Sequence, residues 1–152
     1  MKICVVYFSR SGKTREIAKK LSSKLDTNVF EVTDDKNWKG IFGFIRGGFY
    51  ASFDKDVAVS YDKKATEADV IITLSPLWAG GPSPAMRKFI RENKSKNIHL
   101  VLTNDGSDIN KAFAKTKKII PEISKMYGIT KKLNNEAQVI DNVVADMNER
   151  FD

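Results

Sequence analysis

Short apolar runs alternate with amphipathic stretches along most of this chain. The apolar runs predict five strands, at Lys2–Ser9, Asn28–Val32, Val70–Leu74, Ile98–Thr103 and a short one near Ile129–Leu133. All but the last are nearly continuous in apolar residues, which is typical of parallel strands covered on both faces. Helical spacing of apolar residues predicts helices at Thr14–Leu25, Pro84–Glu92 and Ile109–Ile120, and a C-terminal helix that includes Ile140, Val143, Val144, Met147 and Phe151. This alternation predicts an α/β fold with a parallel sheet and right-handed crossovers.

The segment from Asp34 to Val59 is rich in both aromatic residues and glycine. Its large apolar residues follow helical spacing at Trp38, Ile41, Phe42, Ile45, Phe49 and Phe53. We therefore expect a second crossover helix that packs this aromatic stripe on the sheet. Four glycines in the same segment would each cost a helix about 1 kcal/mol relative to alanine. They favour close backbone approach or a mobile lid, and both interpretations stay open.

The most informative short motif, Ser9-Arg10-Ser11-Gly12-Lys13-Thr14, directly follows the first apolar run. A buried strand that turns sharply into a helix leaves backbone N–H groups without partners, and the helix dipole adds positive charge there. The serine and threonine hydroxyls supply further donors. The motif therefore predicts a phosphate-binding turn at the start of the first helix.

A nucleoside triphosphate fits this turn poorly. Gly12-Lys13-Thr14 matches the end of the G-x-x-x-x-G-K-[ST] loop, but Tyr7 stands where that motif needs its first glycine. Asp105 is the nearest candidate for a Mg²⁺-binding aspartate, and it lies beyond the apolar run that ends at Leu102. The dinucleotide fingerprint G-x-G-x-x-G is also absent. A monophosphate is the better match.

Three polar segments, each following a buried strand, resemble the flavin-binding loops of flavodoxins. The Ser-x-Ser-Gly-x-Thr pattern at Ser9–Thr14 is similar to the FMN phosphate loop of that family. Ser75–Pro82 contains a Pro-x-Trp-x-Gly loop, and Thr103–Ser107 follows the fourth strand. The resemblance covers nearly the whole chain. It implies one domain, 1–152, with a flavodoxin-like doubly wound, five-stranded parallel sheet of order 2-1-3-4-5 in three α/β/α layers, and FMN at the switch point.

The resemblance also implies a role for each loop. Trp78 would stack on the isoalloxazine, Ala79-Gly80 would face flavin N5, and Asn104–Gly106 would line the pyrimidine edge. The third loop has no second stacking aromatic residue, so the outer flavin face would be either open or covered by an aromatic residue of the 34–59 segment such as Phe49 or Tyr50. The implied cofactor-binding residues are Ser9, Arg10, Ser11, Gly12, Lys13, Thr14, Pro76, Leu77, Trp78, Ala79, Gly80, Asn104, Asp105 and Gly106. No residue is assigned a catalytic role.

Length, charge and composition narrow the class of protein and its expected partners. The chain has 152 residues, enough for one domain with a sizeable core. No apolar run approaches the ~20 residues of a membrane span, and we expect a cytoplasmic protein with no membrane partner. The net charge is +7, but the lysines are scattered over predicted helix faces, so we expect no nucleic-acid partner. Cys4 and His99 are interpreted as structural residues, and no metal-ligand spacing is present.

These features favour an electron-transfer flavoprotein that exchanges electrons with a redox partner protein or a small acceptor such as a quinone. An alternative is an NAD(P)H-dependent quinone or flavin oxidoreductase on the same fold. A binding module that has lost the flavin is a third reading, against which the intact phosphate loop argues. The chain is expected to be a monomer or a homodimer. Fold alone does not decide among these functions.

Overall fold

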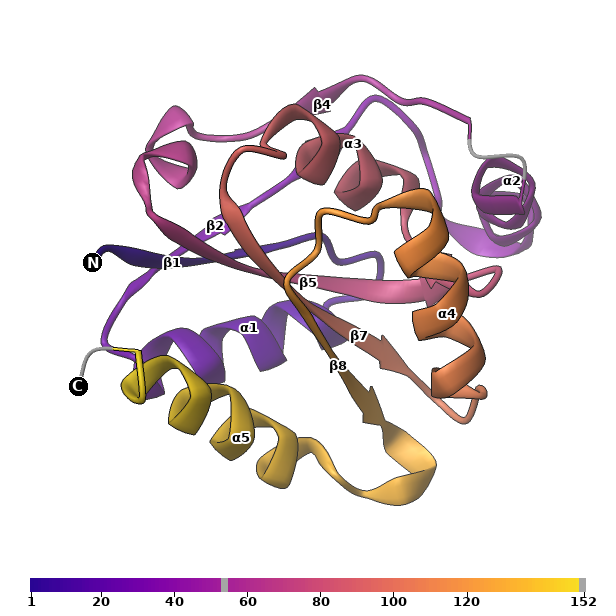
Figure 1. Cartoon of the computed structure of the whole chain (residues 1–152). Helices are drawn as coiled ribbons and strands as arrows, with labels where there is room; N and C mark the ends of the chain where they lie inside the picture. The colour runs from indigo at the N-terminus through magenta and orange to yellow at the C-terminus, as the bar shows by residue number, and fades with distance from the viewer. Residues whose placement is uncertain (53–54, 151–152) are drawn as a thin grey trace.

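A computed structural model describes residues 1–52 and 55–150 of the chain. Its centre is a parallel sheet in the order β2-β1-β5-β7-β8, shown in Figure 1. These strands span Asn28–Glu31, Ile3–Tyr7, Val70–Trp78, Asn97–Asn104 and Lys125–Thr130, in that order across the sheet. The short β6 (Gly81–Pro82) pairs antiparallel with the end of β5, and β3 (Thr33–Asp34) pairs with β4 (Val59–Ser60). The predicted order 2-1-3-4-5 of five parallel strands is confirmed.

Helices cover both faces of this sheet. Helices α1 (Lys13–Lys24) and α5 (Glu136–Asn148) lie below it in Figure 1, whereas α3 (Pro84–Glu92) and α4 (Ile109–Ile119) pack on the opposite face. In strand β1, successive side chains point to opposite faces of the sheet, so the strand contributes to both hydrophobic cores. Val5 and Tyr7 pack with α1 and α5, while Cys4 and Val6 pack with α3 and α4. The expected C-terminal helix is confirmed up to Asn148; Phe151 lies outside the described residues.

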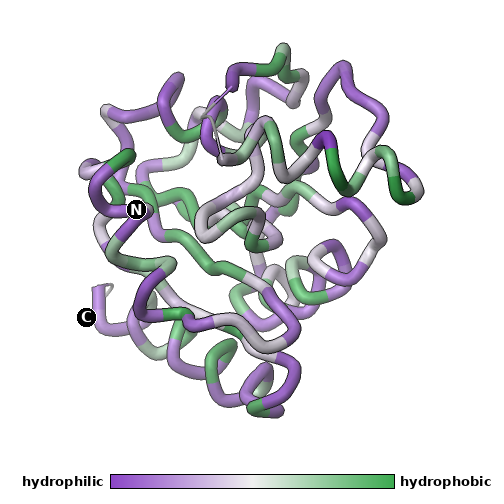
Figure 2. Tube along the Cα trace, turned by 90° about the vertical axis from the view of Figure 1, so that its right-hand side faces the viewer, coloured by the Kyte–Doolittle hydropathy of each residue, from purple (hydrophilic) through white to green (hydrophobic). Residues whose placement is uncertain are grey.

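The hydropathy of the chain matches these layers. In Figure 2 the central strands are continuously hydrophobic, whereas the helices along the lower edge alternate between hydrophobic and hydrophilic residues. That colouring is expected of strands buried on both faces and of helices that turn one side to solvent.

The fifth strand differs from its prediction at 129–133. It runs over Lys125–Thr130, and Lys131–Leu133 forms the single 3₁₀ turn η2, where Leu133 is exposed. Gly128 obscured the strand because glycine weakens a strand pattern. The glycine is needed there, since a Cβ at this position would lie 2.3 Å from Cγ1 of Ile109 on α4.

Helix α2 (Gly40–Ser52) confirms the predicted second crossover helix but not its orientation. Gly43, Gly47 and Ala51 are the residues it buries. Of the aromatic stripe expected on the sheet, Trp38 is buried just before the helix as predicted, but Ile41, Phe42, Ile45 and Phe49 are exposed. A Cβ on Gly43 would lie 2.1 Å from the backbone carbon of Trp38, so only glycine allows this approach. Phe53, the last residue of the predicted stripe, lies outside the described residues.

One further element, a short 3₁₀ helix, precedes β5. The 3₁₀ helix η1 (Lys63–Glu67) begins after Asp62, whose carboxylate accepts a hydrogen bond from the Lys64 N–H. It leads into β5, whose first residue, Val70, pairs with Ile3 of β1. Within residues 1–52 and 55–150, no helix is both long enough and apolar enough to cross a membrane.

Candidate functional site

The turn between β1 and α1 has the geometry of an anion cradle. Gly12 stands at the helix start with φ of 98°, a conformation that favours glycine, and its N–H donates to Ser9 Oγ at 3.0 Å. The first hydrogen bond of the helical pattern runs from Glu16 N–H to the Gly12 carbonyl. The N–H groups of residues 13–15 therefore have no acceptor within the helix. A Cβ built on Gly12 would meet no atom within 4 Å, so there is open space beside these donors.

Thr14 connects this turn to the neighbouring loop. Its side chain is buried, and its Oγ1 lies 2.9 Å from Oγ1 of Thr103 at the end of β7. A threonine near a helix start often caps it, but here Gly12 holds the cap position and no side chain caps the helix. The Thr14 hydroxyl is thus placed by the sheet edge.

The loop after β7 lies next to the cradle, as predicted. Lys13 Nζ is 3.9 Å from Asp105 Oδ1, although both side chains are largely exposed. The Asn104 side chain shapes the loop: its Nδ2 donates to Thr130 Oγ1 at 3.2 Å, and its Oδ1 accepts from Ser107 N–H. These bonds hold the Asn104 side chain within the loop.

The second predicted loop, 75–82, is largely strand. β5 continues through Trp78 and turns back into β6, with Leu77 opposite Pro82 and Trp78 opposite Gly81. Ala79 and Gly80 form the two-residue turn, with φ of 49° and 80°, the positive values that tight hairpin turns require. The Ala79 carbonyl accepts a hydrogen bond from Lys115 Nζ at 2.5 Å. The expected Ala-Gly turn is therefore present, and α4 holds its peptide in one orientation.

Trp78 lies in an aromatic cluster at this edge of the sheet. Its ring meets those of Phe8 and Trp38 edge to face, with centroids 5.6 and 5.2 Å away. Trp38 is itself buried and donates from Nε1 to Asp34 Oδ2 at 2.7 Å. Burial raises the pKa of the Asp34 carboxyl above its ordinary value, against the lowering effect of that hydrogen bond. Trp78 stays half-buried, so part of its surface is open to a ligand.

Arg10 is turned toward α2 rather than along the cradle. Its Nε donates to the Trp38 carbonyl at 2.6 Å and its Nη2 to the Gly40 carbonyl at 3.1 Å. The guanidinium also lies 5.9 Å from the centre of the Phe44 ring. Arg10 therefore connects the cradle to the start of α2, and its positive charge stays close to the cradle.

A half-enclosed cavity of about 220 Å³ lies between the β5–β6 turn and α2. The residues that line it are Arg10, Gly43, Phe44, Gly47, Gly48, Leu77, Trp78 and Ala79. The α2 residues among them were not predicted as site residues. Their signal was the small-residue spacing Gly43, Gly47 and Ala51, which marks one helix face. A Cβ on Gly47 would lie 3.1 Å from the Trp78 ring, so glycine lets the helix and this ring approach closely.

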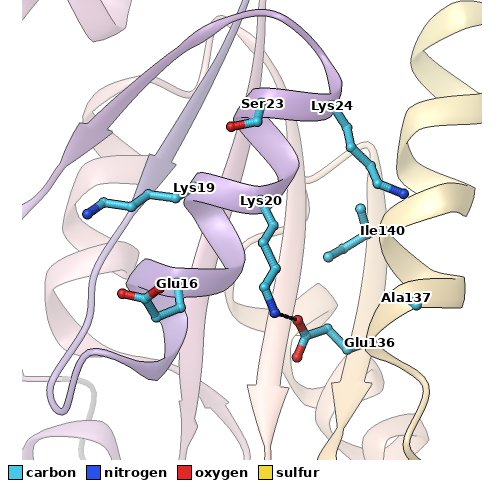
Figure 3. A pocket seen from close by; sticks show the side chains of 8 residues that line it. All are labelled: Glu16, Lys19, Lys20, Ser23, Lys24, Glu136, Ala137 and Ile140. Atoms are coloured by element: carbon cyan, nitrogen blue, oxygen red, sulfur yellow. Dashed lines mark hydrogen bonds and ion pairs between the residues drawn. The ribbon is translucent and has the colours of Figure 1, made fainter.

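A larger surface hollow lies elsewhere, between α1 and α5 (Figure 3). Its walls carry long charged side chains, and Lys20 Nζ pairs with Glu136 Oε1 at 2.7 Å across it. This ion pair joins the two helices, and the hollow shares no residue with the predicted site. We therefore assign this hollow and its ion pair a structural role, that of joining α1 to α5.

Other reactive side chains are buried away from the cradle. Burial raises the pKa of the Cys4 thiol to about 11, so the thiol stays protonated. His99 is fully buried, and burial lowers its pKa to about 4. In the part of the chain that the structure describes, no cluster of His, Cys, Asp and Glu side chains is arranged to hold a metal ion.

Comparisons with known proteins give structural matches only. No family model matches the sequence, and no curated protein matches it either. A flavoprotein from Lactobacillus acidophilus NCFM, solved in complex with FMN, matches with a TM-score of 0.68 at 18% identity, over 91% of this chain and 97% of that one. A flavodoxin from the domain Archaea matches with a TM-score of 0.57 at 18% identity, over 99% and 98%.

A third match is an NADPH-quinone reductase from P. pentosaceus, with a TM-score of 0.58 at 8% identity, over 95% of this chain and 96% of that chain. At these identities the comparisons establish architecture. The matches agree with the observed strand order and with the helices on both faces of the sheet. This chain has the flavodoxin-like fold.

Proposed function

We propose that this chain binds FMN at the edge formed by the start of α1, the β5–β6 turn and the loop after β7, and that it transfers electrons through the flavin. The observation that carries the proposal is the α1 cradle, with donors at residues 13–15 beside open space at Gly12. It suits a terminal phosphate, and the L. acidophilus flavoprotein of the same fold was solved with FMN. Bound FMN would supply reversible one- and two-electron redox chemistry.

The chain's own residues would bind and orient the flavin. The helix N-terminus and the Ser11 and Thr14 hydroxyls would hold the phosphate, with charge from Lys13 and Arg10 nearby. Trp78 would contact the ring system, since it is half-buried beside the cradle. The Lys115 side chain, bonded to the Ala79 carbonyl, would fix the peptide at the flavin edge.

Titration of the apo-protein with FMN, riboflavin and ATP tests the binding step. We expect saturable quenching of FMN fluorescence at one flavin per chain, weaker binding of riboflavin, and no competition by ATP. ATP binding without an FMN response would contradict the proposal. If none of the three ligands binds, the result would instead favour the flavin-free binding module.

A quinone or flavin reductase is the second candidate. It is favoured by the cavity between Trp78 and α2, which offers room for a second planar molecule, and by the match to an NADPH-quinone reductase. Anaerobic stopped-flow mixing of the FMN-loaded protein with NADH or NADPH separates the two functions. Rapid bleaching of the flavin absorbance identifies a reductase. Slow or absent bleaching leaves an electron carrier, whose acceptor, a partner protein or a quinone, stays a prediction.

A further inference from the structure

Exposed large apolar side chains are concentrated on α2. Seven such residues are exposed in the part of the chain that the structure describes, and five belong to this helix. They are Ile41, Phe42, Phe44, Ile45 and Phe49, exposed by 71, 85, 69, 62 and 51%, and together they are called the α2 face here. None of them belongs to either core cluster. In Figure 1, α2 lies at one side of the molecule, away from α1 and α5.

The α2 face is large for a monomer. At these exposures its side chains present on the order of 600 Å² of apolar surface, given the size of aromatic residues. That is at the top of the range of roughly 300–600 Å² for the largest patch on a typical monomer. Surface of this extent marks an interaction site, because leaving it in water has a continuing cost in free energy.

The shape of the face suits another helix. Ile41, Ile45 and Phe49 are spaced four residues apart and form a ridge along α2. Gly48 lies beside Ile45, and a Cβ built on it would meet no atom within 4 Å. No contact within the described chain therefore requires this glycine, although glycine weakens a helix relative to alanine. It leaves a groove that an approaching ridge can fill.

The charges around the α2 face also favour a protein partner over an anionic membrane. The two arginines that border the face are both engaged within the chain. Arg10, whose guanidinium lies 5.9 Å from the centre of the Phe44 ring, donates to two backbone carbonyls. Arg46 is folded back, with its guanidinium 5.9 Å from the centre of the Trp38 ring and 5.7 Å from that of Tyr50. Between Lys36 and Ser52 the chain has no acidic residue, so two copies would bring no carboxylates together. The net charge of +7 repels copies at long range, but salt screens this beyond about 8 Å at physiological strength.

We propose that the α2 face is the interface of a symmetric homodimer, in which the Ile41–Ile45–Phe49 ridge of each copy packs beside Gly48 of the other. Two such faces would remove about 1,200 Å² from water, the lower bound of stable specific interfaces. A two-fold axis makes the contact self-complementary and closed. The interface does not depend on the proposed FMN binding, so the apo-protein should form it as well.

Analytical ultracentrifugation of the full chain, with and without FMN, tests the proposal. We expect the wild type to sediment as a dimer at a protein concentration of about 100 µM and to dissociate on dilution. Phe42→Glu and Ile45→Glu, which place a charge on the face outside the Trp78 cavity, should both give monomers. Leu133→Glu is the matched control, since it charges an exposed apolar residue on η2, and it should stay dimeric. The milder Ile45→Ser and circular dichroism separate lost association from lost folding.

Measurements at different salt concentrations and with lipid vesicles distinguish the dimer from the alternatives. Raising NaCl from about 0.05 to 0.5 M should strengthen the dimer, because it screens like charge while apolar contact persists. A monomeric wild type, or a dimer unaffected by the α2 substitutions, overturns the proposal. Co-sedimentation of a monomer with phosphatidylglycerol vesicles, reversed by salt, would overturn it in favour of a membrane surface.

Discussion

The hydroxyl oxygens of Thr14 and Thr103 lie 2.9 Å apart, although the two residues are 89 positions apart in the chain. This contact joins the second residue of α1 to the end of β7, across the carboxyl edge of the sheet. It places the helix start beside the β7 loop at the edge of the sheet where ligand sites of open parallel sheets lie. The two threonines also form a matched pair for testing what the cradle does.

The cradle hydroxyls should discriminate FMN from riboflavin. Replacing both Ser11 and Thr14 with alanine removes two donors to a charged group, each worth about 1.5–3 kcal/mol. Remaining backbone donors soften the loss, so we expect FMN affinity to fall by about tenfold or more. Riboflavin has no phosphate, and its affinity should barely change. Fluorescence titration of the same variant with both ligands measures the difference.

Thr103→Ala is the control for that experiment. It breaks the same Thr14–Thr103 contact but leaves every phosphate donor of the α1 turn in place. We expect a loss of stability of about 1 kcal/mol, with the FMN-to-riboflavin affinity ratio of the wild type retained. Parallel losses for both ligands in the Ser11→Ala, Thr14→Ala double variant would mean that the cradle does not bind the phosphate.

Trp78→Ala should affect both the ligand and the fold. As a stacking partner, the indole should contribute roughly 1–3 kcal/mol to FMN affinity, by analogy with base–aromatic stacking, and its loss should shift the flavin's reduction potential. Its contacts with Phe8 and Trp38 mean that the melting temperature falls as well. Phe89→Leu, in the α3 core, should lower stability alone. An unchanged potential and affinity in Trp78→Ala would identify Trp78 as a purely structural residue.

Two glycines of α2 should respond oppositely to alanine. At Gly43 the new Cβ would lie 2.1 Å from the Trp38 backbone, and relieving this clash should cost roughly 1–3 kcal/mol. At Gly48 the space is open, and alanine should add up to about 1 kcal/mol through helix propensity. Urea unfolding at low protein concentration measures both. Equal effects would show that α2 does not pack through Gly43.

Stability should fall on mild acidification because of His99. Burial, aided by the nearby positive charge of Arg150, lowers its pKa from 6.5 to about 4. Between these values the unfolded chain takes up a proton that the folded protein does not. The free energy of unfolding should therefore decrease as the pH falls from about 6.5 toward 4, by up to about 3 kcal/mol, and this contribution levels off below.

Chemical denaturation of wild type and His99→Leu across this pH range isolates the effect from that of the carboxylates. The variant lacks the imidazole, so its unfolding free energy should depend less on pH than that of the wild type. Identical pH profiles would show that His99 takes up its proton equally well in the folded protein.

Much of the architecture follows from local pattern. Continuous apolar runs define β1, β5 and β7, because a strand covered on both faces needs apolar residues on both sides. The polar segments that end these strands meet at one edge because parallel strands share their carboxyl end. The resemblance to flavodoxins assigned the Ser9–Thr14 turn and the Asn104–Gly106 loop to one flavin site, and the structure places these two segments in contact.

Tertiary contacts decided the rest. The sequence of α2 offers an aromatic face and a small-residue face, and helical spacing cannot say which one turns inward. The Trp38 and Trp78 rings fill that side, and only glycine at Gly43 and Gly47 fits against them, so the aromatic face is left outside. Likewise, Ser75 and Pro76 became strand because they continue the pairing with β7. Leu77 and Trp78 became strand because Gly81 and Pro82 return to pair with them. Such pairings depend on residues brought together by the fold, whereas hydrophobic period is a property of the chain itself.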